Sequence, residues 1–146
     1  MSIIDEYVNE LDLEACSAKL INSATSQMQE ANIASSQLAQ LTGISEDRIN
    51  ALIENKGTDV HREEINVLCL ATGMGLDIIF DLPNLSDPDD VRNEFDLMQN
   101  TGHKVEAIAF CGPLKNENYD LDTVRSLLYL YCLRRCLLRY PSHEKN

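Results

Sequence analysis

The stretch that most narrowly limits how this chain can fold is residues 33–57. Ser35 and Ser36 can cap a first short helix, and Gly43 supplies the positive φ that ends it. The apolar positions of this helix fall on one face, which consists of Leu38, Ala39 and Leu41. The first part of the stretch therefore predicts one short helix and the turn after it.

A second short helix is predicted directly after this turn. Ile44 is expected to be buried, and Ser45 is a favourable N-cap. Two acidic residues, Glu46 and Asp47, suit the positive end of the helix dipole. The apolar stripe of the second helix consists of Ile49, Leu52 and Ile53. Two helices joined by about four residues that include a glycine form the helix-turn-helix pattern.

The sequence around this pair of helices resembles the helix-turn-helix domain of phage repressors and Cro proteins. The resemblance rests on Ser-Gln-Leu-Ala-Gln-Leu-Thr-Gly-Ile-Ser at 36–45, Arg-Ile-Asn-Ala-Leu-Ile-Glu-Asn-Lys-Gly at 48–57 and Gly-Met-Gly-Leu-Asp-Ile-Ile-Phe at 73–80. It covers residues 17–82 and implies a bundle of about five helices. It implies the fold more firmly than the function, because the same bundle also serves protein contacts.

By this resemblance, the second helix would enter the major groove of DNA. Arg48 would fork onto guanine, Asn50 would pair with adenine, and a carboxylate would accept from cytosine. Donors at the start of the first helix and after the second suit phosphates. The chain departs from the family at the first two exposed positions of the second helix, which are acidic. The expected DNA-binding residues are Ser35, Ser36, Gln37, Ser45, Glu46, Asp47, Arg48, Asn50, Ala51, Asn55, Lys56 and Thr58.

The charge of the chain runs against this expectation. The net charge is −12, whereas phosphate contacts normally rest on Lys and Arg. Residues 31–82 carry eight acidic and three basic residues, and residues 104–146 carry five acidic and seven basic residues. The basic part of the chain is therefore not the helix-turn-helix. An excess of acid also suits a basic protein partner, so DNA and a protein both remain possible ligands of the bundle.

Helical periodicity extends the expected bundle on both sides. It predicts helices over 3–11, 13–30 and 61–72, and a short helical turn over 76–82. Residues 1–82 are thus interpreted as one N-terminal domain. The following Pro-Asn-Leu-Ser-Asp-Pro-Asp-Asp, residues 83–90, has the composition of an acidic linker.

Residues 91–146 form the third expected part of the chain. A short helix is predicted over 91–99, capped by Asp89 or Asp90, with Val91, Phe95 and Met98 on one face. A strand is predicted over 103–111 and a long helix over 120–140. The expected fold class is therefore mainly α, with a five-helix helix-turn-helix bundle followed by a small α+β (helix-strand-helix) dimerisation segment.

The C-terminal segment predicts a homodimer. Between residues 127 and 133 the last helix is apolar on every face, so every face must be covered. A single strand leaves its own backbone groups unpaired, and a two-fold dimer would supply the partner for both elements. The arginines of this helix would line the dimer seam or pair with the acidic N-terminal helix. The expected interface consists of Val105, Ile108, Phe110, Leu127, Leu128, Leu130, Tyr131 and Leu133.

Neither a metal site nor an active site is predicted. Cys132 and Cys136 share a helix face, and Cys111 and His143 would complete a ligand set, but thiols in so apolar a helix favour small core residues. Five cysteines without regular spacing indicate reduced thiols. The histidines are scattered and no glycine-rich phosphate loop occurs, so no cofactor and no catalysis are expected.

The expected class is a cytoplasmic regulator of transcription. No 18-residue apolar run and no basic, signal-like start occur, so no membrane contact is expected. The leading interpretation is a homodimeric repressor that binds a palindromic operator, including that of its own gene. The alternative is an interaction protein, such as an antitoxin or an anti-CRISPR-type inhibitor, that uses a helix-turn-helix domain to bind a protein.

Overall fold

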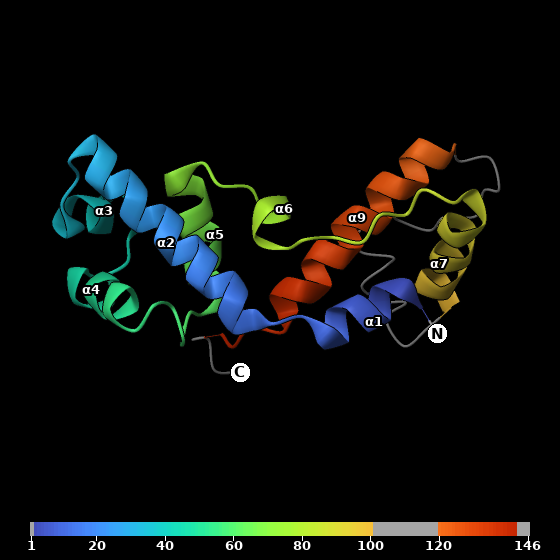
Figure 1. Cartoon of the computed structure of the whole chain (residues 1–146), viewed down its shortest axis with the longest axis horizontal. Coiled ribbons are helices and arrows are strands. Elements are labelled where there is room, and N and C mark those ends of the chain that lie inside the picture. Colours follow the sequence, from blue (N-terminus) through green and yellow to red (C-terminus); the bar gives the residue numbers. More distant parts are fainter. Residues whose placement is uncertain (1, 101–119, 143–146) are drawn as a thin grey trace. The chain divides into compact units, whose positions relative to one another are not determined.

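The computed structural model describes residues 2–100 and 120–142, and every regular element in these residues is a helix (Figure 1). The mainly α fold expected from the sequence is thereby confirmed for these ranges, in which no strand occurs. The strand predicted over 103–111 lies outside the described residues. The helices are α1 (Ile3–Glu10), α2 (Leu13–Ala31), α3 (Ser35–Thr42), α4 (Glu46–Glu54), α5 (Arg62–Thr72), α6 (Leu76–Ile79), α7 (Pro88–Asn100) and α9 (Leu121–Leu138).

The chain divides into two compact units. One consists of Met1–Leu11 with Leu82–Cys136, and we call it the α1–α7–α9 unit. The other consists of Asp12–Asp81 with Leu137–Asn146, and we call it the helix-turn-helix unit. Both units are discontinuous in sequence, whereas the composition of the chain predicts three consecutive segments over 1–82, 83–90 and 91–146.

The helix-turn-helix unit is built around α2, which packs against α4, α5 and α6, while α3 packs against α4 and α5. The apolar stripes of these helices meet in one core. Burying an aliphatic side chain fully contributes about 1.5 to 3 kcal/mol, so this core is the main source of the unit's stability. Its buried members include Leu20, Ile21, Leu38, Ile49, Leu52, Ile65, Leu68, Ile79 and Phe80.

Local sequence explains how the helix-turn-helix pair begins and ends. Gly43 ends α3 with φ +78°, and the Ser45 hydroxyl accepts from the backbone N–H of Arg48 at 3.2 Å, as expected for an N-cap. The cap of α3 differs from the prediction. The N-cap is Ala34, whose N–H donates to the Gln37 side chain at 2.8 Å, so Ser35 is already helical. The Gln37 side chain therefore caps α3 in place of the predicted serines.

Two apolar residues of the pair are less buried than expected. Leu41 is 69% exposed, because α3 packs through Leu38 and through the half-buried Ala39 and Thr42. Ile44, expected to be buried, is half-buried. The turn after α4 fits closely against α2, since a Cβ at Gly57 would lie 2.8 Å from a side-chain carbon of Ile21. Gly57 also has φ +79°, which favours glycine.

The residues after α9 complete the core of the helix-turn-helix unit. The Tyr140 side chain is buried, and its ring centroid lies 6.4 Å from that of Phe80. Its hydroxyl donates to the Leu13 carbonyl at 3.1 Å and accepts from the Ser17 hydroxyl at 3.2 Å. The backbone N–H of Arg62 donates to the Pro141 carbonyl at 2.9 Å. The residues after α9 therefore stabilise the position of α2 through direct hydrogen bonds.

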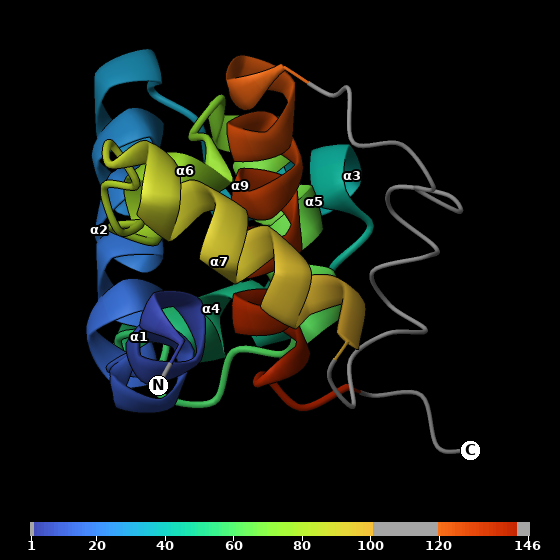
Figure 2. The same ribbon diagram turned by 90° about the vertical axis from the view of Figure 1, so that its right-hand side faces the viewer.

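In the α1–α7–α9 unit, a buried carboxylate receives the start of α1. Glu94 on α7 is 4% exposed and accepts from the Ser2 hydroxyl and from the backbone N–H groups of Ile3 and Ile4. Donors at a helix N-terminus favour a negative charge, which explains how this side chain is buried. Figure 2 views this unit from the side where α1 and α7 lie in front.

Helix α7 begins earlier than predicted. Its first residue is Pro88, and Asp87 accepts the backbone N–H groups of Asp89 and Val91 at 2.9 and 3.1 Å. Asp89 and Asp90, predicted as caps, therefore lie in the first helical turn, where acids suit the helix dipole.

The α9 helix is not covered on every face. Leu128 and Tyr131, two of the predicted interface residues, are buried inside the chain's own core. Leu130 is 47% exposed, and Leu127 and Leu133 are half-buried. The remaining predicted interface residues, Val105, Ile108 and Phe110, lie outside the described residues.

An ion pair links α9 to α1 in the same unit. The Arg135 guanidinium pairs with the Asp5 carboxylate and lies 5.6 Å from the centroid of the Tyr131 ring, within the range of a cation–π contact. Pairing of this basic helix with the acidic N-terminal helix was one of the two alternatives left open by the sequence.

Candidate nucleic-acid interface

Most of the predicted DNA-binding residues lie on the surface of α3 and α4 and of the turns beside them. Exposed among them are Ser36, Gln37, Ser45, Glu46, Asp47, Asn50, Lys56 and Thr58, while Ser35, Arg48, Ala51 and Asn55 are half-buried. The polar side chains at the start of both helices stand where a helix N-terminus can bind an anion.

Arg48 does not point away from the unit, as a base-reading side chain would. Its Nε and Nη2 donate to the two Glu64 carboxylate oxygens at 2.7 and 2.9 Å. Its Nη1 donates to the Asp59 carboxylate at 2.9 Å, and Nη2 also donates to the Asp59 carbonyl at 2.8 Å. The guanidinium thus connects α4 to the loop before α5 and to α5 itself.

The carboxylates of this network are held in their charged form. Burial alone would raise the pKa of Glu64, but hydrogen bonds from Arg48 and from the His61 N–H outweigh it and hold that pKa below its usual value. The hydrogen bond from Arg48 likewise lowers the pKa of Asp59. Glu64 in turn raises the pKa of Arg48 further above its usual range.

These contacts give Arg48 a structural role, while its role in reading guanine stays a prediction. Glu64 is only 5% exposed, and its charge is compensated by Arg48. Removing one partner of a buried ion pair leaves an uncompensated charge and costs about 3 to 5 kcal/mol. Turning Arg48 toward a base would carry much of the same penalty, which exceeds the discrimination of about 1 to 3 kcal/mol from a bidentate base contact.

Two asparagines of the predicted set have different tasks. Asn55 accepts from the Gly57 N–H at 2.9 Å and donates to Asp59 at 2.7 Å, so it stabilises the turn after α4. Asn50 is exposed, and its side-chain oxygen accepts from the Ser35 hydroxyl at 2.8 Å. This bond fixes the Asn50 amide between α3 and α4 and leaves its N–H groups for a ligand.

The face that carries these residues is acidic. Of the three basic residues in 31–82, a range the structure describes in full, Arg48 is bound to carboxylates and Arg62 donates to the carbonyls of Leu138 and Tyr140. Lys56 is exposed, and its ammonium contacts no acceptor in the described part of the chain. Glu46, Asp47 and Glu54 are exposed on α4.

Part of the helix-turn-helix unit matches a known family. Residues 25–83 match the family model described as Cro/C1-type HTH DNA-binding domain. This match confirms the resemblance to the Cro and phage-repressor helix-turn-helix domain that the sequence shows. Comparison with curated proteins and with solved structures gave no match. No helix among residues 2–100 and 120–142 is both long and apolar enough to cross a membrane.

The cysteine pair of α9 behaves as part of a core. Cys132 and Cys136 are both buried, and the hydrogen bond between the two thiols, together with burial, raises the pKa of Cys132 above its usual range. Because the thiolate is the form that binds metals, this environment disfavours metal binding by Cys132. Cys111 and His143, which the sequence offered as further ligands, lie outside the described residues.

The depressed carboxyl pKa values predict a loss of stability in acid. Asp59 and Glu64 stabilise the unit while charged, so this contribution is complete above their unfolded pKa values of about 3.9 and 4.3. It is lost as the pH falls through the lower folded values. We expect the urea midpoint to hold between pH 7 and 5 and to fall by pH 3.5. In Arg48→Met the fall should be smaller, and an equal fall in both proteins would contradict this assignment.

Proposed function

We propose that the chain is a sequence-specific transcriptional regulator that represses its own gene and binds its operator as a homodimer. The observation that supports this most strongly is the match of residues 25–83 to the Cro/C1-type domain, together with the exposed polar side chains at the starts of α3 and α4. No catalytic step belongs to this proposal.

The chemistry of the α3–α4 face favours recognition with few ionic contacts. Asn50 offers amide donors for adenine, and Glu46 and Asp47 offer acceptors for the amino group of cytosine. Ser36 and Gln37 at the start of α3 suit phosphate oxygens, as does the ammonium of Lys56. With so few cations, non-specific binding would be weak and the affinity would come from fitting sites.

The dimer of this proposal rests on the surface of α9. Leu130 is exposed, and Leu127 and Leu133 are each half-buried, which leaves apolar area for a second copy to cover. A dimer would present two α4 helices to a palindromic operator whose half-sites are one helical turn apart.

Selection of DNA from the region upstream of the gene, followed by salt titration, tests the proposal. In residues 31–82, which the structure describes in full, Lys56 is the one cation that does not donate to a carboxylate or carbonyl, so a dimer that binds DNA through this range should give a slope of log affinity against log salt shallower than about −3. Lys56→Ala should weaken all sites alike, whereas Asn50→Ala should lower discrimination at one base by about 1 to 3 kcal/mol. If no sequence is enriched at low salt, the regulator proposal is wrong.

A second function, binding of a basic protein, is favoured by the acidic face itself. Glu46, Asp47 and Glu54 are exposed, while Arg48 on the same helix is turned inward to Glu64. One variant separates the two ligands. Glu54→Gln removes a charge that repels phosphate at a position outside the predicted DNA contacts, so it should strengthen DNA binding but weaken binding to a basic protein captured from the source cell.

A further inference from the structure

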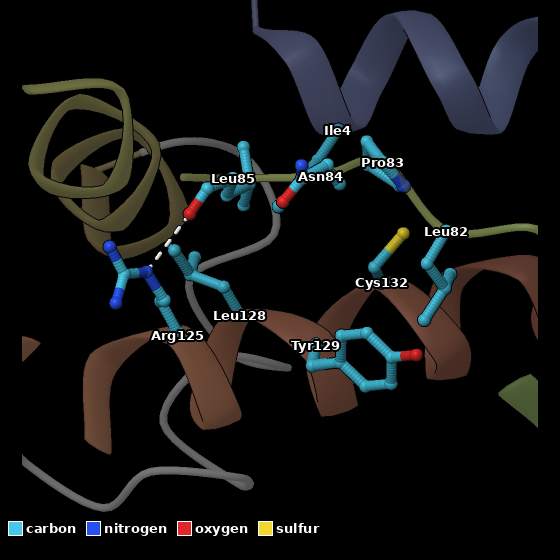
Figure 3. Close-up of a pocket in the computed structure, with 9 residues that line it drawn as sticks. All are labelled: Ile4, Leu82, Pro83, Asn84, Leu85, Arg125, Leu128, Tyr129 and Cys132. Atoms are coloured by element: carbon cyan, nitrogen blue, oxygen red, sulfur yellow. Dashed lines mark hydrogen bonds between the residues drawn. The ribbon is translucent and has the colours of Figure 1, made fainter. Parts of the chain in front are cut away.

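The α1–α7–α9 unit contains a cavity of about 340 Å³ that the proposed function does not use (Figure 3). The segment 82–85 crosses over α9 and forms one wall, and Ile4 from α1 and Leu128 and Cys132 from α9 form the rest of the buried lining. The volume is at the lower end of small-molecule pockets, whose range begins at roughly 300 Å³.

The walls are largely apolar and the mouth is open. Leu82, Pro83 and Leu85 are half-buried, while Asn84 and Tyr129 are exposed at the rim. A partly open apolar space favours a ligand whose hydrocarbon part displaces water from these side chains.

Arg125 gives this cavity a cationic end. Its Nε donates to the Leu85 carbonyl at 2.9 Å and one Nη donates to the Ser86 carbonyl at 3.0 Å, which braces the crossing segment above α9. The other Nη pairs at 3.2 Å with Asp122, a carboxylate whose side chain is 93% exposed. A pair this exposed is weak, so the carboxylate of a ligand can take the place of Asp122.

We propose that this cavity binds a small amphipathic anion with an apolar chain, such as a medium-chain carboxylate. The chain lies between the crossing segment and α9, against Leu82 and Leu128, and the carboxylate lies at Arg125. Every residue that lines this site belongs to the α1–α7–α9 unit, whereas the predicted DNA-binding residues belong to the helix-turn-helix unit.

Calorimetric titration of the full chain with decanoate and with decan-1-ol tests the site. Both should bind one to one, and decanoate should bind more tightly because only it has a charge for Arg125. Arg125→Gln should reduce the ratio of the two affinities about two- to fivefold, the range expected for a partly exposed ion pair. Arg92→Gln, which removes an exposed cation of α7 outside the lining, should leave that ratio unchanged.

A variant that fills the mouth of the cavity tests whether the two probes bind there. Asn84→Trp adds bulk at the rim and should weaken both probes at least tenfold, whereas Asn93→Trp, the same change at an exposed site on α7, should not. Independently of any variant, magnetisation transfer from the decanoate chain to the methyl groups of Leu82 and Leu128 should be observed. Absence of saturable binding, or binding that Asn84→Trp leaves intact with no transfer to these methyl groups, would overturn the proposal.

Discussion

Replacing Arg48 by alanine should lower the free energy of unfolding of the helix-turn-helix unit by about 3 to 5 kcal/mol. The reason is that Glu64 would keep its charge in a buried position after losing two hydrogen bonds, of 2.7 and 2.9 Å, from the guanidinium. Small domains are stable by only about 5 to 15 kcal/mol, so this loss is a large fraction of the unit's stability. Urea denaturation followed by circular dichroism measures this change.

Two controls separate the structural role of Arg48 from a role on DNA. The double variant Arg48→Met with Glu64→Leu replaces the ion pair by apolar side chains and should recover most of the stability, as buried pairs often do on such replacement. Asn50→Ala, on the exposed face of the same helix, should change stability by about 1 kcal/mol or less. An Arg48→Ala variant that folds as well as wild type and loses only guanine selectivity would restore the base-reading role.

The ion pairs of Arg48 could not be predicted from the sequence. Arg48 lies at the edge of the apolar stripe of α4, one turn before Leu52, and the family resemblance assigns it to a DNA base. Its partners lie 16 and 11 residues further along, at Glu64 and Asp59, and only the packing of α5 against α3 and α2 brings them near. The sequence does contain one indication that the Glu64 side chain is held in place. Glu64 is the third residue of α5, a position at which glutamate caps a helix, and it accepts from the His61 N–H.

The elements that were predicted correctly depend on local chemistry. Gly43, Ser45 and the apolar residues Ile49 and Leu52 define the turn and α4 through interactions within a few residues. The expected caps at Ser35, Asp89 and Asp90 were wrong because a neighbouring residue satisfied the helix start first. Serine and aspartate near a helix start therefore indicate that a helix begins, while its first residue depends on which donor finds a partner.

The hydrophobic pattern of the sequence did not predict the buried polar residues or the two discontinuous units. Glu94 occupies a buried position of α7 because the N-terminus of α1, more than ninety residues away in sequence, supplies its donors. When α7 is considered alone, a carboxylate at position 94 is predicted to face solvent. The same limitation applies to the residues after α9, whose composition does not indicate that they belong with α2 and α5.

Replacing Tyr140 by alanine should destabilise the helix-turn-helix unit by about 3 to 5 kcal/mol, the usual effect of truncating a buried aromatic side chain. The ring is 3% exposed beside Phe80, so its removal leaves a cavity in the core of the helix-turn-helix unit. Tyr140→Phe keeps the ring but removes the hydroxyl that bonds Leu13 and Ser17, and should cost about 1 to 3 kcal/mol. Urea denaturation of both variants measures these differences.

Tyr129→Ala provides the matched control, because Tyr129 is an exposed tyrosine of α9 whose truncation should change stability by about 1 kcal/mol or less. If Tyr140→Ala were as mild as Tyr129→Ala, the residues after α9 would not belong to the core.

The expected outcome also affects how the dimer is tested. A chain cut after Pro83 would lack Tyr140 as well as α9, so loss of DNA binding in that fragment would not distinguish a missing dimer from a damaged domain. Leu130→Glu in the full chain avoids this ambiguity, because it changes the exposed face of α9 and leaves Tyr140 in place.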